Sequence, residues 1–307
     1  MSSEWGKTLL WTGMHILLLL SLVTPLGFVT THFLLIPLLV AFVVSDVRKF
    51  AIVYAAMIGL LMLVLGGAGL LLALFSLFYL VPAALMGRQY RKGASPGVAV
   101  ISGILGVIGA ALLALVVFYA AGFNIADGFK AYLRSDAGTL ELMTQILGSE
   151  EELDLTIKLM VDMIPMMIIT FAVYTTLLAH WLGRKILTRG GIEVGRLKPM
   201  KEWRLPRSLV FLYLIVLILE LFVSVEPGST LSVILINASP LLTYAFAFQA
   251  AGFLFFLADL RGWNRALPIA SIVLMPVPGL AQLFAWLGVL DVSFPIRERI
   301  AEKRPQD

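Results

Sequence analysis

The sequence predicts an all-α fold, a polytopic bundle of transmembrane helices with eight to nine membrane segments. Two observations support this prediction. Hydrophobic residues make up 60% of the chain, charged residues only 14%, and the mean hydropathy is +0.96. In addition, long uncharged tracts alternate with short charged loops. A soluble domain cannot bury so much apolar surface, whereas uncharged tracts of about 20 residues are typical of helices that span a bilayer.

The two N-terminal tracts, 8–45 and 50–87, are each long enough for two spanning helices. Each carries a turn signal near its centre, TPLG at 24–27 in the first and GGAG at 66–69 in the second. Clusters of Pro and Gly mark turns. The tracts therefore predict two helical hairpins, with helices over 8–24, 28–45, 50–65 and 69–87.

Five further segments follow, and a hydrophilic stretch separates the first two of them. The helices are expected over 97–121, 158–182, 208–225, 229–258 and 266–290. The stretch 122–158 is net acidic and has apolar residues at helical spacing. It predicts an amphipathic helix at the outer interface, or a lid over an outward-facing pocket. The expected domains are a six-helix bundle (1–182), a basic cytoplasmic loop (183–207), C-terminal membrane segments (208–293) and a charged tail (294–307).

Lys and Arg in the short loops predict the orientation of the chain. One set of loops is basic and contains Arg48, Lys49, Arg88, Arg91, Lys92, the eight bases of 183–207, Arg261 and Arg265, and the N-terminal Lys7 is on the same side. The opposite loops hold only Lys130, Arg134 and Lys158. We therefore expect an integral protein of the cell (cytoplasmic) membrane with its N-terminus in the cytoplasm.

The last tract leaves two topologies open. Nine crossings would place the tail outside, although the tail carries Arg297, Arg299, Lys303 and Arg304. PVPG at 276–279 interrupts the tract, so it can instead form a re-entrant hairpin. That alternative leaves eight crossings and returns the tail to the cytoplasm.

Several function classes are disfavoured by what the sequence lacks. There is no cysteine, so disulfides and thiolate chemistry are excluded. The three histidines, His15, His32 and His180, are too scattered to predict a metal site. No GxxxxGK, GxSxG or HExxH motif is present. We therefore expect neither an enzyme nor a bound cofactor or metal, and no ATPase activity of its own.

The segment LINASPL at 235–241 supplies the main candidate binding residues, because it places polar groups and a proline inside a long uncharged run. Pro240 removes a helix hydrogen bond, and Asn237 and Ser239 can partner the freed backbone groups. Either this is a satisfied kink, or it is an unwound half-helix that lines a cavity. Tyr244 lies on the same predicted face as Asn237. Gln249, further along, is either a ligand contact or a helix–helix hydrogen bond.

Charged residues inside spans are the second set of candidates, since charge is costly in a bilayer. Glu220 lies within the predicted helix 208–225. Asp162 follows Lys158 by one turn, so it either binds a ligand or forms a local salt bridge. His15 and His32 are expected to face each other across the first hairpin, as a structural pair or as a proton relay. Gly106 and Ala110 form a small-xxx-small face that predicts close helix packing.

Short motifs relate the chain to known proteins. The ending LGVLDVSFPIRER (287–299), FQAAG (248–252) and the TPLG turn resemble the YybS-type bacterial membrane proteins, over essentially the whole chain. The first six helices are more distantly similar to the S-components of energy-coupling factor vitamin transporters. That similarity implies a six-helix bundle with a ligand pocket near its outer end. S-components dock through an Ala-x-x-x-Ala face on helix 1, where this chain offers Thr8 and Thr12.

Two functions follow as competing expectations. The first is transport-related binding of a small molecule, which would require an energising subunit or an ion gradient because the chain has no ATP motif. The second is a membrane scaffold that recruits a cytoplasmic protein partner through the basic loop 183–207. Nucleic acid is disfavoured as a partner, because Trp203 is the only aromatic residue interleaved with these bases. The lipid bilayer is the remaining expected partner.

Overall fold

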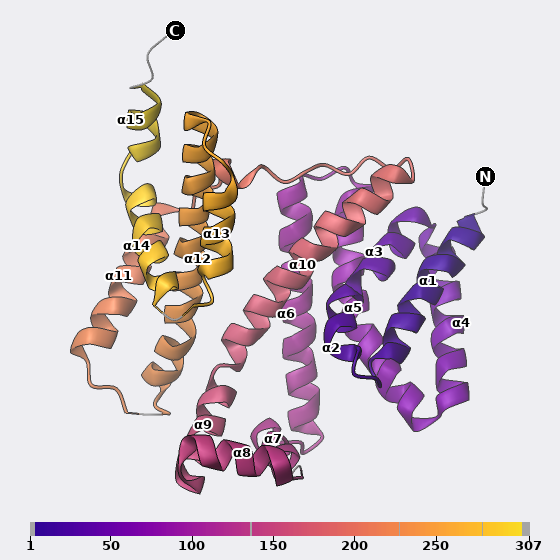
Figure 1. Ribbon diagram of the computed structural model, residues 1–307. Coiled ribbons are helices and arrows are strands. Elements are labelled where there is room, and N and C mark those ends of the chain that lie inside the picture. Colours follow the sequence, from indigo (N-terminus) through magenta and orange to yellow (C-terminus); the bar gives the residue numbers. More distant parts are fainter. Residues whose placement is uncertain (1–3, 136, 227, 278, 303–307) are drawn as a thin grey trace. The chain divides into compact units, whose positions relative to one another are not determined.

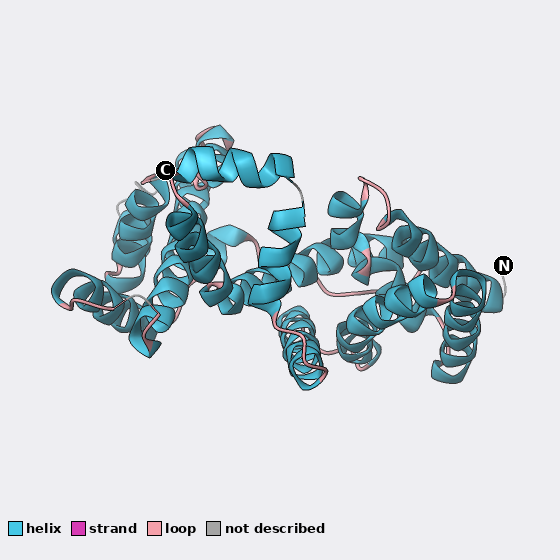
Figure 2. Cartoon of the chain, turned by 90° about the horizontal axis from the view of Figure 1, so that it is seen from below, coloured by secondary structure: helices cyan, strands magenta, loops and turns pink. Residues whose placement is uncertain are grey.

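The protein is described here by a computed structural model that covers residues 4–302 except 136, 227 and 278. Every regular element of the described residues is a helix, and Figures 1 and 2 show helices joined by loops without a strand. The all-α fold class is therefore confirmed. The chain divides into two compact units: unit 1 comprises 1–124 and 167–197, and unit 2 comprises 125–166 and 198–307. The domain boundaries expected at 182, 207 and 293 stay predictions, because they divide the chain by composition rather than by contact.

Unit 1 contains the two N-terminal hairpins and the two long helices that follow. Its elements are α1 (Glu4–Ser21), α2 (Gly27–Thr30), η1 (Thr31–Phe33), α3 (Leu35–Val44), α4 (Val47–Leu65), α5 (Gly67–Arg91), α6 (Pro96–Ala120) and most of α10 (Ile164–Arg189). Both expected turns are present. The first separates α1 from α2, and the second lies at Gly66, whose φ of 56° requires a glycine.

The core of unit 1 surrounds α3, which is buried along most of its length. Neighbouring helices approach closely where small residues allow it. A side chain at Gly106 would meet the Pro82 backbone of α5 at 2.8 Å, and one at Gly103 would meet Thr176 of α10 at 2.5 Å. The packing role expected for Gly106 is consistent with this contact.

Unit 2 contains the remaining elements. These are α7 (Ile125–Ser135), α8 (Ala137–Leu147), α9 (Glu150–Asp162), η2 (Met200–Glu202), α11 (Arg207–Phe222), α12 (Thr230–Arg261), α13 (Ala266–Leu274), α14 (Leu280–Ser293) and α15 (Ile296–Glu302). The stretch 122–158 thus forms short helices in place of one amphipathic helix. α7 follows Gly122 and α9 follows Gly148, two glycines whose positive φ allows the chain to turn.

The last membrane tract folds as two short helices beside α12. α13 has nine residues, a length of about 14 Å against a hydrocarbon core of about 30 Å. α14 then runs parallel to α12, because Gly288 lies against Phe246 and Asp291 is bonded to Gln249. Figure 1 shows the chain descending through α13 and returning through α14. This arrangement is compatible with the re-entrant alternative, and the choice between eight and nine crossings stays a prediction.

Six helical segments of the described residues are long and apolar enough to cross a membrane, or seven if the bent pair α14 and α15 is one span. They are Gly27–Val44, α4, α5, α6, α10 and α12. The expectation of eight to nine segments also includes α1 and α11. α11 has only 16 residues, and α1 begins with the charged Glu4 and Lys7.

Candidate functional site

Asn237, at the centre of LINASPL, is buried and fully bonded within unit 2. Its Oδ1 accepts from the backbone N–H of Met166 at 2.7 Å, and its Nδ2 donates to the carbonyls of Asp162 and Val233, each at 2.7 Å. Asp162 ends α9 and Met166 lies in the first turn of α10, so these are backbone groups that a helix end leaves without intrahelical partners. α12 continues as one helix through Pro240. Asn237 therefore joins α12 to the α9–α10 junction.

Of the other polar candidates near this segment, Asp162 is bonded to Asn237 through its backbone carbonyl, whereas Glu220 and Tyr244 share no hydrogen bond with Asn237 in the described residues. The Ser239 hydroxyl donates to Glu220 Oε2 at 3.1 Å on the exposed side of α11. Tyr244 is 41% exposed and lies on the outer face of α12. Asp162 contributes its backbone carbonyl to the Asn237 contact, and no ion pair with Lys158 occurs among the described residues. A ligand-binding role for these residues stays a prediction.

Gln249 belongs to a separate buried network, which we call the Asp291 cluster: Gln249, Asp291 and Arg297 with the backbone groups they bind in 201–205. Gln249 Nε2 donates to Asp291 Oδ2 at 2.6 Å and to the Trp203 carbonyl at 3.2 Å. Its Oε1 accepts from the N–H of Leu205 at 3.0 Å. Both donors and the acceptor of the amide are therefore used within the protein.

The charges of the Asp291 cluster form a two-point ion pair. Arg297 donates through Nε to Asp291 Oδ1 at 2.8 Å and through Nη2 to Oδ2 at 2.5 Å. Its Nη1 donates to the Lys201 carbonyl at 2.5 Å, and its guanidinium lies 5.8 and 5.5 Å from the rings of Phe253 and Phe256. The side chains of Asp291 and Arg297 are 0% and 4% exposed. Such burial is tolerated only when charges are paired and hydrogen-bonded, as here.

The Asp291 cluster brings the two longer family motifs together. FQAAG supplies Gln249 and Gly252, and the ending LGVLDVSFPIRER supplies Gly288, Asp291 and Arg297. A side chain at Gly252 would meet the carbonyl of Met200 in η2 at 2.7 Å, and one at Gly288 would meet the α12 backbone. The motifs therefore encode a contact in which α12, α14, α15 and the segment 200–205 meet.

Sequence reasoning selected Gln249 and missed its two charged partners. Asp291 is an acid at the end of an apolar tract, a pattern that by default marks a functional or buried residue. Arg297 follows six residues later, beyond one helical turn, and the chain between them bends by 71°. No local spacing rule relates residues across such a bend, so their pairing could not be read from the sequence.

His15 forms the corresponding network in unit 1. Its Nδ1 is 3.0 Å from the Leu34 carbonyl, which can only accept, so Nδ1 carries the proton. In the neutral ring Nε2 then accepts from the Ser76 hydroxyl at 2.8 Å, and Ser76 Oγ accepts from Tyr54 at 2.8 Å. We call this the His15 chain. It links α1, α4 and α5 to the start of α3 without a charge.

The expectation that His15 and His32 face each other is wrong. His32 lies among aromatic rings, with its ring 5.3 Å from that of Tyr174 and 6.2 Å from that of Phe28. His32 Nδ1 is buried and has no hydrogen-bond partner in the described part of the chain. The turn of 22–26 and the short helix α2 displace His32 from the depth at which a straight hairpin would place it.

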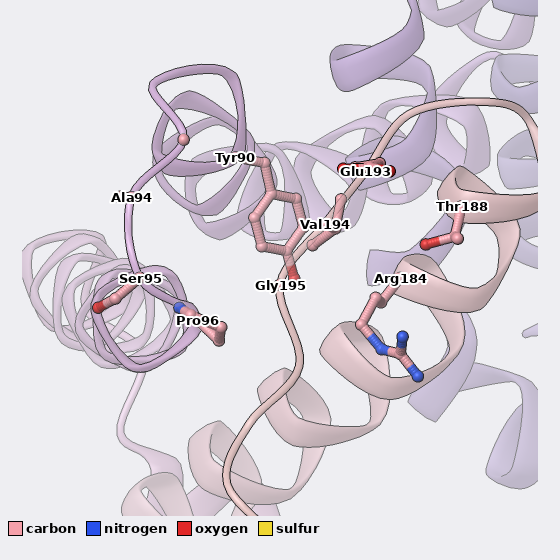
Figure 3. A pocket seen from close by; sticks show the side chains of 10 residues that line it. Tyr90, Ala94, Ser95, Pro96, Arg184, Thr188, Glu193, Val194 and Gly195 are labelled. Carbon is pink, nitrogen blue, oxygen red and sulfur yellow. The ribbon is translucent and has the colours of Figure 1, made fainter.

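A pocket of about 480 Å³ lies in unit 1, between the α5–α6 turn and the segment that follows α10. Figure 3 shows Ser95 and Pro96 on one side, Arg184 and Thr188 on the other, and Tyr90 between them; Glu193 also lines the pocket. The volume falls within the range of small-molecule sites, about 300–1,000 Å³. None of these residues was a candidate in the sequence, because they lie in three separate segments.

Local interactions hold the walls of this pocket in place. The Tyr90 hydroxyl is 2.7 Å from His180 Nδ1, which fixes the ring between α5 and α10. Ser95 caps α6 by accepting from the N–H of Val98 at 3.5 Å. A side chain at Gly195 would meet Pro96 at 2.8 Å, so only glycine lets the segment after α10 approach α6 this closely.

The fold and these networks define a polytopic α-helical membrane protein whose helices are joined by buried polar contacts. The chain belongs to the family described as Predicted membrane protein (DUF2232), whose model matches residues 14–292. It is 27% identical over 228 residues to the Uncharacterized protein YybS of Bacillus subtilis (strain 168), a match that covers 70% of this chain and 72% of that protein. The expected YybS-type family is thereby confirmed. No solved structure matches significantly, and the similarity to S-components stays a prediction.

Proposed function

We propose that the protein is a transport-related membrane protein that binds a small molecule in the pocket between the α5–α6 turn and the segment after α10. The pocket itself carries this proposal, because it combines a suitable volume with polar groups from three segments. Asn237 of LINASPL, first expected to bind the ligand, is occupied by contacts within the protein. With no ATP-binding motif in its sequence, the chain would act with an energising subunit or an ion gradient.

The same proposal includes the cell membrane as its location and a cytoplasmic N-terminus. The pocket lies at the basic end of unit 1, where α5 ends with Arg88 and Arg91 and α10 ends with Arg189. Basic loops favour the cytoplasmic side. The pocket is therefore expected to open to the cytoplasm.

Single cysteines test this orientation cleanly, since the chain has none of its own. Cysteines that replace Lys92 and Ser149 should react with an impermeant thiol reagent from opposite sides of the membrane. Labelling of both from the same side would contradict the orientation.

Filling the pocket tests the binding function. Thr188→Trp places a large side chain on the pocket wall, and Val98→Trp is the matched control, because Val98 is exposed on α6 but does not line the pocket. The detergent-purified full chain would be screened against metabolites by thermal unfolding. A ligand at about 100 times its Kd stabilises by about 2.7 kcal/mol. We expect stabilising ligands for the native chain and for Val98→Trp, and none for Thr188→Trp. A ligand shift that survives in Thr188→Trp would refute the pocket as the site.

The second candidate function is the scaffold that recruits a protein partner through 183–207. Lys201 and Arg204 are engaged within the protein, with Asp259 and Glu298 at 2.6 Å each. Arg189, Arg196 and Lys198 are exposed and form no ion pair in the described part of the chain. These three are among the bases available to an acidic partner. Replacing them with Gln should remove a salt-sensitive band from a pull-down, whereas Lys201→Gln should retain it; without such a band the scaffold function is refuted.

A further inference from the structure

We propose that the pocket of unit 1 recognises a small zwitterion, a molecule that carries a phosphate or carboxylate together with an ammonium group. This inference rests on the proposed function, since it assigns the ligand class of the same pocket. Its basis is a pair of opposite charges, Arg184 and Glu193, that line the pocket from different segments without binding each other.

Arg184 and Glu193 come from different segments and are not bonded to each other. Arg184 comes from the last turns of α10 and Glu193 from the segment that follows α10. Among the described residues neither side chain takes part in an ion pair or a hydrogen bond. Figure 3 shows the Arg184 guanidinium and the Glu193 carboxylate on different edges of the pocket. Both charges are thus available to a bound molecule.

Their presence in one pocket restricts the ligand. An anion alone would be attracted by Arg184 and repelled by Glu193, and a cation alone would experience the reverse. A molecule with both charges satisfies both groups, and each contact becomes a charge-assisted hydrogen bond. The planar guanidinium fits the paired oxygens of a phosphate or carboxylate, and the carboxylate of Glu193 accepts from an ammonium group.

The uncharged groups of the wall favour the same ligand. The hydroxyl of Thr188, on the same side as Arg184, can donate to anionic oxygens, and the hydroxyl of Ser95 lies on the opposite side of the pocket. Tyr90 is held by His180 and presents an aromatic ring between the two sides. A ring of this kind stabilises a nearby ammonium group.

Two sources can supply such a zwitterion. One is a free metabolite that carries an amine and an anionic group, and the other is the headgroup of an aminophospholipid. Both present the same chemistry to Arg184 and Glu193. Phosphoethanolamine represents that chemistry without a lipid tail, and phosphatidylethanolamine in the detergent micelle represents the lipid source.

The experiment measures binding of four probes to the detergent-purified full chain by calorimetry: phosphoethanolamine, phosphocholine, inorganic phosphate and ethanolamine. We expect phosphoethanolamine to bind about tenfold or more tightly than each of the others, the change produced by losing one charge-assisted hydrogen bond. Phosphocholine is the matched probe, because its quaternary nitrogen has no N–H to donate to Glu193.

Substitutions of Arg184 and Glu193 test which charged group of the ligand each residue binds. Arg184→Gln should abolish the binding of phosphoethanolamine. Glu193→Gln should weaken phosphoethanolamine and strengthen inorganic phosphate, because it removes a repulsive charge. Arg189→Gln is the control, since Arg189 is an exposed neighbour that does not line the pocket. If added phosphatidylethanolamine displaces phosphoethanolamine, the lipid headgroup is the source; without displacement the source is a free zwitterion.

The outcomes separate this inference from the proposed function. If none of the four probes binds, or if phosphoethanolamine binds no better than phosphate, the zwitterion is refuted. The inference also fails if Glu193→Gln leaves the order of affinities unchanged. Loss of metabolite binding in Thr188→Trp would still support the pocket in those cases. If Thr188→Trp retains every ligand, both proposals fail together.

Discussion

The buried polar network of unit 1 contains a neutral ring, His15, whereas that of unit 2 contains an ion pair, Asp291 and Arg297. In the His15 chain each hydrogen bond joins uncharged groups, and the carbonyl of Leu34 determines which ring nitrogen carries the proton. In the Asp291 cluster two full charges are buried and are bonded to each other, to Gln249 and to the backbone carbonyl of Lys201.

The two networks differ in the free energy that is lost when one of their members is removed. A neutral network has little desolvation to offset, so losing one member costs a hydrogen bond or two. A buried ion pair has a large desolvation cost, so losing one member leaves an uncompensated charge. We therefore expect unit 2 to be the more sensitive unit to substitution within its network. Four predictions test this comparison, from the largest expected effect to the smallest.

Arg297→Met should cause the largest loss of stability. The substitution leaves Asp291 buried without its cation, and breaking a buried pair in this way costs about 3–5 kcal/mol. The measurement is the free energy of unfolding of the detergent-purified protein. Arg299→Met is the control, because Arg299 is exposed two residues away. The double variant Asp291→Leu/Arg297→Met should recover much of the loss. A double variant as unstable as the sum of the two single variants would contradict a pairwise role for the charges.

His15→Leu should destabilise unit 1 less than Arg297→Met destabilises unit 2. It leaves the Leu34 carbonyl and the Ser76 hydroxyl without partners, a cost of about 1–3 kcal/mol. The same unfolding measurement applies, with His32→Phe as the contrast. His32 packs near the rings of Phe28 and Tyr174, and its Nδ1 has no hydrogen-bond partner in the described structure, so His32→Phe should be neutral or stabilising. Equal losses from both substitutions would show that the His15 chain has no special role.

Asn237→Leu should destabilise the junction of α9 and α10 by about 1–2 kcal/mol, since it removes the bonds to Asp162 and Met166. Hydrogen exchange of the Met166 amide should accelerate at the same time, because that amide loses its acceptor. Tyr244→Leu, on the exposed face of the same helix, should change neither quantity. If Asn237→Leu abolished ligand binding while stability stayed intact, Asn237 would have to be a ligand contact after all.

Lys201→Gln should have the smallest effect. Its partner Asp259 is exposed, and such surface pairs contribute little to stability and weaken with salt. Unfolding in low and high salt measures this contribution. A loss comparable to that of Arg297→Met would place the Lys201 side chain inside the Asp291 cluster, where the structure shows only its backbone carbonyl.

Much of the fold followed from local sequence patterns. The helices, the turns at 22–26 and 66, and the interruption of the last tract were predictable because apolar runs form helices in lipid and because Gly and Pro end them. The single amphipathic helix expected over 122–158 was replaced by three short helices, and the turn between α8 and α9 lies at Gly148, whose positive φ spacing alone did not reveal. The sequence left two alternatives for Gln249, and one of them, a helix–helix hydrogen bond, corresponds to the contacts observed.

The sequence by itself determined that the protein is an all-α membrane protein of the DUF2232 family, because composition, helix breaks and motifs are local properties of the chain. Only the tertiary structure decided which polar groups meet. Asn237 bonds residues more than 70 positions away, Gln249 meets Asp291 across two helices, and the pocket of Arg184 and Glu193 also draws on the α5–α6 turn. A buried polar group needs a partner, and its partner depends on how helices pack, which no local spacing encodes.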